Sequence, residues 1–212
     1  MKNKSIIKDF LDGISAGLLI IIGCSVYLAC ENKYVGAVLF SIALLCICIK
    51  GYNLYTGKIG FMKENCNKNG FSTLFLGLLG NAVATIIFGY LVSVALPVLK
   101  ERAVILFQNK TTQELWQTLI RGLFCGVLMY LAVSIYRDGK SIVGILFAIP
   151  VFILSGFEHS IADLGYFAIS NCVSFEAFLF IMVVILGNSI GSLILPLLKI
   201  NNSPKESENA KS

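Results

Sequence analysis

Long apolar runs separated by short polar segments make up most of the chain. They lie at residues 11–30, 34–49, 71–99, 115–136, 141–154 and 175–198. A helix needs about 20 apolar residues to cross a bilayer, so each run is a candidate span or part of one. Only 14% of the residues are charged, against about 25% in soluble domains, which excludes an ordinary soluble domain and a disordered chain. The pattern predicts an all-α membrane protein with six transmembrane helices.

The second and fifth runs are too short to cross a bilayer as uninterrupted helices, and each leads into a polar segment. These segments are residues 50–57 (KGYNLYTG) and 155–160 (SGFEHS), and apolar residues resume after both. Non-helical backbone is tolerated at membrane depth only where protein buries it or where it lines a cavity. We therefore predict that the second and fifth helices are broken, as in many channels and transporters.

The two halves of the chain resemble each other at an offset of roughly 105 to 109 residues. The matching positions are Gly13 and Gly17 with Gly122 and Gly126, Gly51 with Gly156, and Gly80-Asn81 with Gly187-Asn188. Each half holds three spans, and an odd number gives the halves opposite topology, so we predict two inverted repeats at about 11–100 and 115–199. Small residues four apart also let helices approach closely, and both interpretations can hold.

Basic residues are unevenly distributed between the two sets of connecting segments. The net charge is +5, but the lysines and arginines lie mostly at helix ends, which indicates topology rather than a nucleic-acid partner. The segments on the side of the termini hold eleven of them and the opposite segments hold four. The positive-inside rule then places both termini in the cytoplasm of a multi-pass protein of the cell membrane. We predict one transmembrane domain over residues 1–200 and a disordered cytoplasmic tail over 201–212.

Ionisable and hydroxyl residues at the two breaks are the first candidates for function. His159, the only histidine, lies beside Glu158 in an apolar segment, where ionisable groups tend to face a cavity or a partner. His159 is either a proton-exchanging pore residue or a hydrogen-bonded packing residue. Glu158 is predicted to stabilise the break by accepting hydrogen bonds from its freed backbone N–H groups. Thr56 either bonds a solute or His159, or caps the half-helix that follows it.

Lys110, just before the fourth span, is either a solvated loop lysine or a vestibule charge that raises the local concentration of anions. No nucleophile with a base, phosphate-binding loop or metal-ligand spacing is visible, so neither an enzyme nor a cofactor or metal is predicted. Cys46 and Cys48 face different sides of a helix, which disfavours a metal site between them. The seven cysteines are odd in number and read as small buried side chains rather than a disulfide set.

Two of these segments resemble signatures of the formate/nitrite transporter family. SGFEHSIAD (155–163) is similar to the family's fifth-helix signature, and GYNLYTG (51–57) is similar to its second-helix break. The two Gly-Asn pairs also fit, and the resemblance extends from residue 13 to residue 198. It implies an aquaporin-like fold, a homopentamer with one pathway per protomer, and passage of small monovalent anions of weak acids such as formate, nitrite or hydrosulfide.

The resemblance also implies roles for individual residues. His159 is the expected central pore histidine with Thr56 as its partner, and Lys110 takes the place of the family's vestibule lysine. Leu54 is expected at an outer constriction flanked by Met129 and Ser155. The expected cytoplasmic constriction is formed by Phe40, Leu44 and Phe152.

Two positions depart from the family pattern. Where the family usually has asparagine in its fourth helix, Cys125 is followed by Gly126, which predicts a missing polar anchor and a wider pore. Lys50, just before the first break, is not typical of the family and is predicted to point away from the pore, with Asp163 as its possible pairing partner.

Apolar constrictions oppose the passage of a bare anion, because the ion loses its hydration there, whereas a neutral acid loses little. We therefore predict a channel or transporter through which weak-acid anions cross with a proton that His159, linked to Thr56, supplies or relays. The alternative is a non-transporting membrane subunit of the same fold with a vestigial pore, for which Gly126 and Lys50 are the motivation.

Overall fold

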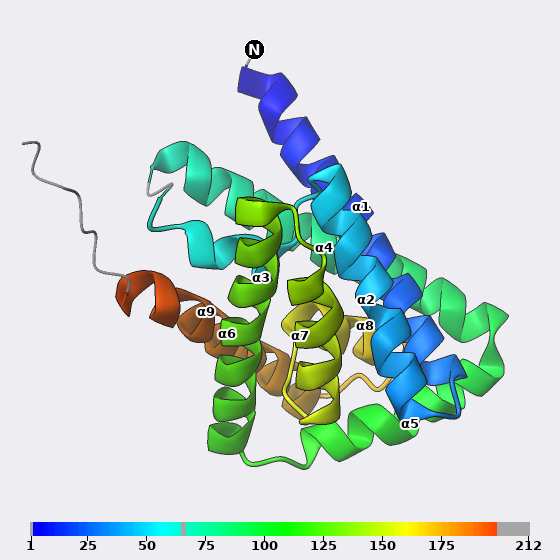
Figure 1. Ribbon diagram of the computed structural model, residues 1–212. Coiled ribbons are helices and arrows are strands. Elements are labelled where there is room, and N and C mark those ends of the chain that lie inside the picture. Colours follow the sequence, from blue (N-terminus) through cyan, green and yellow to red (C-terminus); the bar gives the residue numbers. More distant parts are fainter. Residues whose placement is uncertain (1, 65–66, 199–212) are drawn as a thin grey trace, which may run out of the picture.

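The computed structural model describes residues 2–64 and 67–198, and the part of the chain that it describes is helical without strands (Figure 1). The predicted disordered tail lies outside the described residues. The elements are α1 (Lys2–Ala29), α2 (Lys33–Lys50), α3 (Tyr55–Lys58), the 3-10 turn η1 (Ile59–Phe61), α4 (Lys68–Ala95), α5 (Pro97–Thr111), α6 (Leu115–Gly139), α7 (Val143–Leu154), α8 (Ser160–Ser170) and α9 (Phe175–Leu198).

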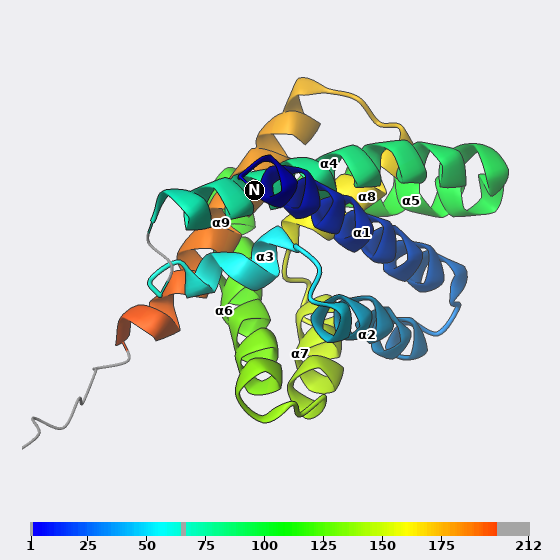
Figure 2. The same cartoon turned by 90° about the horizontal axis from the view of Figure 1, so that it is seen from above.

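The elements form two equivalent sets. In the first set α1 packs against α4 and α2, and in the second α6 packs against α9 and α7. In Figure 1, α1 descends from the labelled N-terminus while α6 rises from the end of α5, so the two sets run in opposite directions. Viewed from above, α2 and α7 lie next to each other in the lower half of the view (Figure 2). The prediction of an all-α, aquaporin-like membrane fold with two inverted repeats is confirmed.

Both predicted breaks are present, and both begin at a glycine. α2 ends at Gly51 with φ of 72°, and α7 is followed by Gly156 with φ of 71°. Only glycine adopts this left-handed backbone without strain, which explains why the residue occurs at both positions. The chain resumes as α3 after the first break and as α8 after the second.

The third span differs from its prediction at its far end. We predicted an apolar helix over 71–99, but α4 ends at Ala95. Leu96 has φ of −131° and ψ of 74°, because the residue before a proline is disfavoured in helical conformation. Pro97 then occupies the first turn of α5, where its missing N–H costs nothing. The segment with Lys110, predicted as a connecting loop, is therefore a helix, and it packs against α8.

Five of the described helices are long and apolar enough to cross a membrane, namely α1, α2, α4, α6 and α9. The sixth crossing is formed by the short apolar helix α7 with α8. Large apolar side chains are exposed on the outside of the bundle, among them Phe75 (66% exposed), Trp116 (62%) and Phe147 (68%). Such a surface suits contact with lipid or with other protein subunits.

Glycines allow α6 and α9 to touch backbone to backbone. A Cβ atom on Gly191 would lie 1.9 Å from the carbonyl oxygen of Leu123. Gly191→Ala is therefore expected to push the helices apart and to lower the free energy of unfolding by about 1 to 3 kcal/mol. Thermal unfolding of the detergent-solubilised protein, followed by circular dichroism, measures this change.

The matched control for this substitution is Gly139→Ala at the end of α6. A Cβ atom there would meet no atom within 4 Å, so the melting temperature is expected to stay at the wild-type value. Equal melting temperatures for Gly191→Ala and the wild type would contradict the close packing of α6 on α9.

Candidate functional site

The two breaks bring Thr56 and His159 together in the middle of the protein. Thr56 Oγ1 and His159 Nε2 are 2.8 Å apart. Thr56 is completely buried and His159 is 3% exposed. Thr56 therefore bonds the histidine, whereas the start of its own half-helix has no side-chain cap.

The hydrogen bonds of His159 define which of its nitrogens carries the proton. Nδ1 accepts a hydrogen bond of 3.1 Å from the backbone N–H of Ala162, so this nitrogen caps the start of α8. In the neutral ring the proton then resides on Nε2, which donates to Thr56 Oγ1. This leaves the hydroxyl hydrogen of Thr56 for another acceptor. His159 is thus both a structural cap and a group with a proton at the centre of the bundle.

A pair of asparagines holds the two breaks in equivalent ways. Asn81 Oδ1 accepts from the backbone N–H of Tyr55 at 2.9 Å, and its Nδ2 donates to the carbonyl oxygens of Gly13 and Asn53. Asn188 Oδ1 accepts from Ser160 N–H at 2.8 Å, and its Nδ2 donates to the carbonyl oxygens of Gly122 and Glu158. We call these two residues the asparagine ties. At each break they satisfy one backbone N–H and one carbonyl that no helix satisfies, and they also bond a carbonyl inside α1 or α6.

The predicted role of Glu158 in bonding freed backbone N–H groups is therefore corrected. Its carboxylate accepts hydrogen bonds from Lys110 Nζ and, at 2.7 Å, from Gln113 Nε2. Only the backbone carbonyl of Glu158 takes part in the tie to Asn188. The side chain that bonds the unpaired backbone groups of the second break is Asn188. The Gly187-Asn188 pair was the signal in the sequence, since a buried amide carries both a donor and an acceptor.

Two cavities lie on opposite sides of the Thr56–His159 pair. The Lys110 cavity has a volume of about 280 Å³, and its lining includes Phe40, Lys110, Arg121, Phe152, His159 and Asp163. The Lys58 cavity has a volume of about 180 Å³, and its lining includes Leu44, Leu54, Lys58, Tyr136, Arg137 and Lys140. The two linings share no residue among those described.

Buried apolar side chains flank the central pair on both sides, and the Lys110 cavity reaches His159 itself. On one side Phe40 and Phe152 meet edge to face at 6.4 Å, and Phe152 stacks on the His159 ring at 5.7 Å. On the other side Leu44 and Leu54 are each 1% exposed. The predicted grouping of Phe40 and Phe152 with Leu44 is therefore wrong. The two aromatic rings lie on the Lys110 side, and Leu44 shares the opposite side with Leu54.

The other two residues predicted at a constriction lie elsewhere. Met129 is 1% exposed and packs in the apolar core, outside the residues that line the two cavities. Ser155 is exposed on the surface of the chain, at the end of α7. Met129 and Ser155 therefore do not flank Leu54 as predicted.

Comparison with known proteins decides the family. A sequence profile described as Formate/nitrite transporter matches residues 2–200. The chain belongs to the formate/nitrite transporter family. Its relatives include proteins named as a transporter and a channel rather than as enzymes.

Two curated relatives of this formate/nitrite transporter family member have been compared in sequence. "Uncharacterized transporter YwcJ" of Bacillus subtilis (strain 168) is 31% identical over 149 residues, which cover 63% of this chain and 58% of the relative. "Formate channel FocB" of Escherichia coli (strain K12) is 25% identical over 185 residues, which cover 76% of this chain and 66% of the relative. The matches thus span less than two thirds of either relative.

Solved structures of the family share the fold. An "FNT family ion channel" superposes with a TM-score of 0.77 at 22% identity, over 92% of this chain and 87% of the other. A "Pentameric formate channel with formate bound" superposes with a TM-score of 0.75 at 23% identity, over 92% of this chain and 96% of the other. These similarities independently support the aquaporin-like arrangement of the helices.

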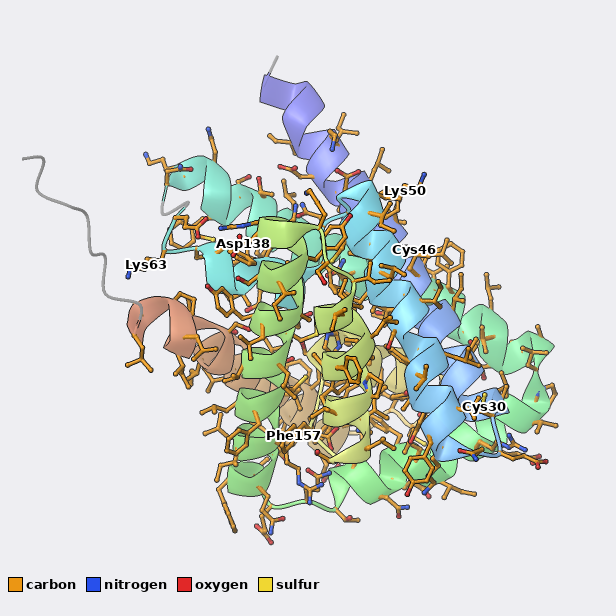
Figure 3. All side chains as sticks on the ribbon, in the orientation of Figure 1. Cys30, Cys46, Lys50, Lys63, Asp138 and Phe157 are labelled. Carbon is orange, nitrogen blue, oxygen red and sulfur yellow. The ribbon has the colours of Figure 1, made fainter. Side chains whose placement is uncertain are left out.

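Lys110 of this family member is neither solvated nor alone. Its side chain is 16% exposed and its ammonium group contacts the carboxylates of both Glu158 and Asp163, the latter at 3.1 Å. The prediction of a loop at Lys110 and of a pairing between Lys50 and Asp163 is therefore wrong. Lys50 instead is exposed at the end of α2, and Figure 3 shows its side chain directed away from the body of the protein.

The wider pore predicted at Gly126 is also corrected. A Cβ atom on Gly126 would lie 2.3 Å from the carbonyl oxygen of Asn188 and 2.8 Å from the backbone nitrogen of Ser192. The position therefore faces α9 rather than a pathway. A side chain such as asparagine has no room there, so the missing amide leaves no gap between the two cavities.

Proposed function

We propose that the protein is a channel or transporter for small monovalent anions of weak acids, with formate, nitrite and hydrosulfide as candidates. The observation that carries the proposal is the buried Thr56–His159 hydrogen bond, which lies between two cavities and has apolar side chains on both sides. Membership of the family and the names of relatives such as the formate channel FocB support the substrate class.

Crossing is proposed to occur as the neutral acid. A bare anion pays a large desolvation penalty between apolar side chains, and protonation removes most of it. The Nε2 proton of His159 and the hydroxyl of Thr56 form a chain through which a proton reaches or leaves the solute. Transport then rises as the external pH falls, because protons become more available to His159 and, through it, to the solute.

The proposed assembly is a homopentamer in the cell membrane with both termini in the cytoplasm. The fold similarity to a pentameric formate channel supports the oligomeric state, and the surplus of basic residues on the side of the termini supports the orientation. With this orientation the Lys58 cavity opens towards the cytoplasm and the Lys110 cavity towards the outside.

Stopped-flow flux into proteoliposomes tests the proposal. The purified protein is challenged with formate, nitrite and hydrosulfide at several external pH values, beside protein-free vesicles. We expect flux to rise with acidity, and His159→Asn to remove that dependence because asparagine cannot exchange a proton. Gln108→Ala, an exposed change on α5, is the control and keeps the wild-type profile.

Flux that responds neither to pH nor to His159→Asn would contradict proton-coupled transport. A folded oligomer that passes none of the three anions would instead favour the non-transporting subunit. The packing of Gly126 against α9 and the exposure of Lys50 give that alternative no support.

A further inference from the structure

The Lys110 cavity contains two carboxylates that share one ammonium group. Lys110 Nζ contacts Glu158 Oε2 and lies 3.1 Å from Asp163 Oδ1. The side chains of Glu158 and Asp163 are 2% and 1% exposed. Glu158 has a second donor in Gln113, at 2.7 Å, so its carboxylate is well provided with hydrogen bonds. Asp163 has only Lys110 as a donor among the described residues, so its negative charge is less well stabilised than that of Glu158.

One oxygen of Asp163 has no hydrogen-bond partner among the described residues. This atom is Oδ2, and it is buried in a residue that lines the Lys110 cavity. A buried carboxylate oxygen without a donor is costly when the group is ionised, and much less so when it carries a proton. The geometry therefore favours a carboxyl group that binds a proton at Oδ2.

The other groups around Asp163 decide what this proton does to the charge of the cavity. Besides Glu158, its charged neighbours are Lys110 from α5 and Arg121 from α6, both of which line the cavity. The remaining titratable neighbours are neutral side chains, namely Cys24 and Tyr27 from α1, Tyr166 from α8 and the ring of His159. The helices α4 and α9 also pack on α8. None of the described residues that line the cavity is a charged residue of α4 or α9.

The formal charge of the cavity lining therefore depends on Asp163. With both acids ionised, Lys110 and Arg121 are balanced by Glu158 and Asp163. With Asp163 protonated, one positive charge is left over, and a cavity with excess positive charge concentrates anions. We propose that Asp163 is a proton-binding site of the Lys110 cavity, and that its protonation admits monovalent anions while its ionisation opposes their entry.

This proposal rests on the proposed function but acts at a different step. A proton from solvent forms an O–H bond at Asp163 Oδ2, hydronium becomes water, and the charge of the cavity rises by one. The solute itself gives and takes no proton in this step. The effect therefore extends to anions of strong acids, whose own protonation does not change in the accessible pH range.

Nitrate affinity, measured on the purified protein by isothermal titration calorimetry, separates the two effects. Nitrate stays ionised between about pH 5 and pH 8, and it can enter the Lys110 cavity without crossing the apolar side chains beyond it. The affinity of the wild type is expected to fall as the pH rises. Asp163→Asn is expected to show a flat profile and about fivefold higher affinity at the alkaline end, because one negative charge has left the cavity. Glu101→Gln, an exposed acid on the same helix as Lys110, is the matched control and follows the wild type.

Infrared difference spectroscopy of the same samples gives a readout that needs no transport. A carbonyl band of a protonated carboxylic acid is expected to titrate in the wild type and in Glu101→Gln, and to be missing in Asp163→Asn. If the asparagine variant does not fold, Asp163→Glu replaces it, with a retained band and a shifted midpoint as the expected result. Formate flux, measured in parallel, reports on the proposed function independently.

The proposal is overturned if the wild type and Asp163→Asn share one infrared titration, or if they share one pH profile of nitrate affinity. If the wild type does not pass formate, the proposed function fails. The infrared titration of Asp163 then still decides whether the residue binds a proton.

Discussion

Asn188→Ala is expected to lower the free energy of unfolding by about 2 kcal/mol or more, since two buried backbone groups are left without a partner, at about 1 to 3 kcal/mol each. The amide of Asn188 bonds Ser160 N–H and the carbonyl oxygens of Gly122 and Glu158, each at 2.8 Å. Alanine leaves Ser160 N–H and the Glu158 carbonyl without a protein partner in an apolar interior, whereas the Gly122 carbonyl lies inside α6 and keeps its helical hydrogen bond. Thermal unfolding of the solubilised protein measures the loss, and size-exclusion chromatography shows whether the oligomer survives.

Two further variants make this result specific. Asn81→Ala removes the equivalent tie at the first break and is expected to destabilise the protein by a similar amount. Asn69→Ala, at an exposed position near the start of α4, is expected to melt like the wild type. If Asn188→Ala melted at the wild-type temperature, the breaks would have to be held by other contacts.

Leu54→Ala is expected to raise the formate flux about tenfold, which corresponds to about 1.4 kcal/mol of barrier. Leu54 is 1% exposed, lines the Lys58 cavity and comes two residues before Thr56. Its side chain contributes to the apolar closure between that cavity and the central pair. A shorter side chain lets water accompany the solute further, so less hydration is lost on the way. Stopped-flow measurements on proteoliposomes provide the rates.

Loss of a buried leucine also costs stability, so the flux is compared at equal amounts of folded oligomer. Leu131→Ala, a change of the same kind at a position that is 37% exposed on α6, is the control and keeps the wild-type flux. Unchanged flux through a correctly assembled Leu54→Ala variant would mean that the pathway does not pass Leu54.

Much of the fold could be predicted from the sequence because the bilayer restricts the alternatives. Apolar runs of known length predicted the spans, and glycine at 51 and 156 marked the breaks, where both residues have positive φ. The helix α5 was missed because its composition is mixed and the pattern of a membrane span does not apply to it. Its start at Pro97 was the available signal.

The candidate site was predictable in its residues but not in all their partners. The resemblance placed His159 and Thr56 in one pathway, and the structure joins them by a hydrogen bond. The link between Lys110 and Asp163 depends on how α5 packs against α8, which the sequence pattern does not contain. The grouping of Phe40 with Leu44 was also misjudged, because the two residues lie on one helix but line different cavities.

The asparagine ties also fix which residues occupy equivalent places in the two halves. Leu54 and His159 are the residues that precede α3 and α8, and each lies between two residues whose backbone a tie holds. The same backbone geometry therefore presents an isobutyl group from one repeat and an imidazole from the other. The two halves of the pathway therefore differ chemically through one side chain at an equivalent position, while the backbone arrangement of the two breaks stays the same.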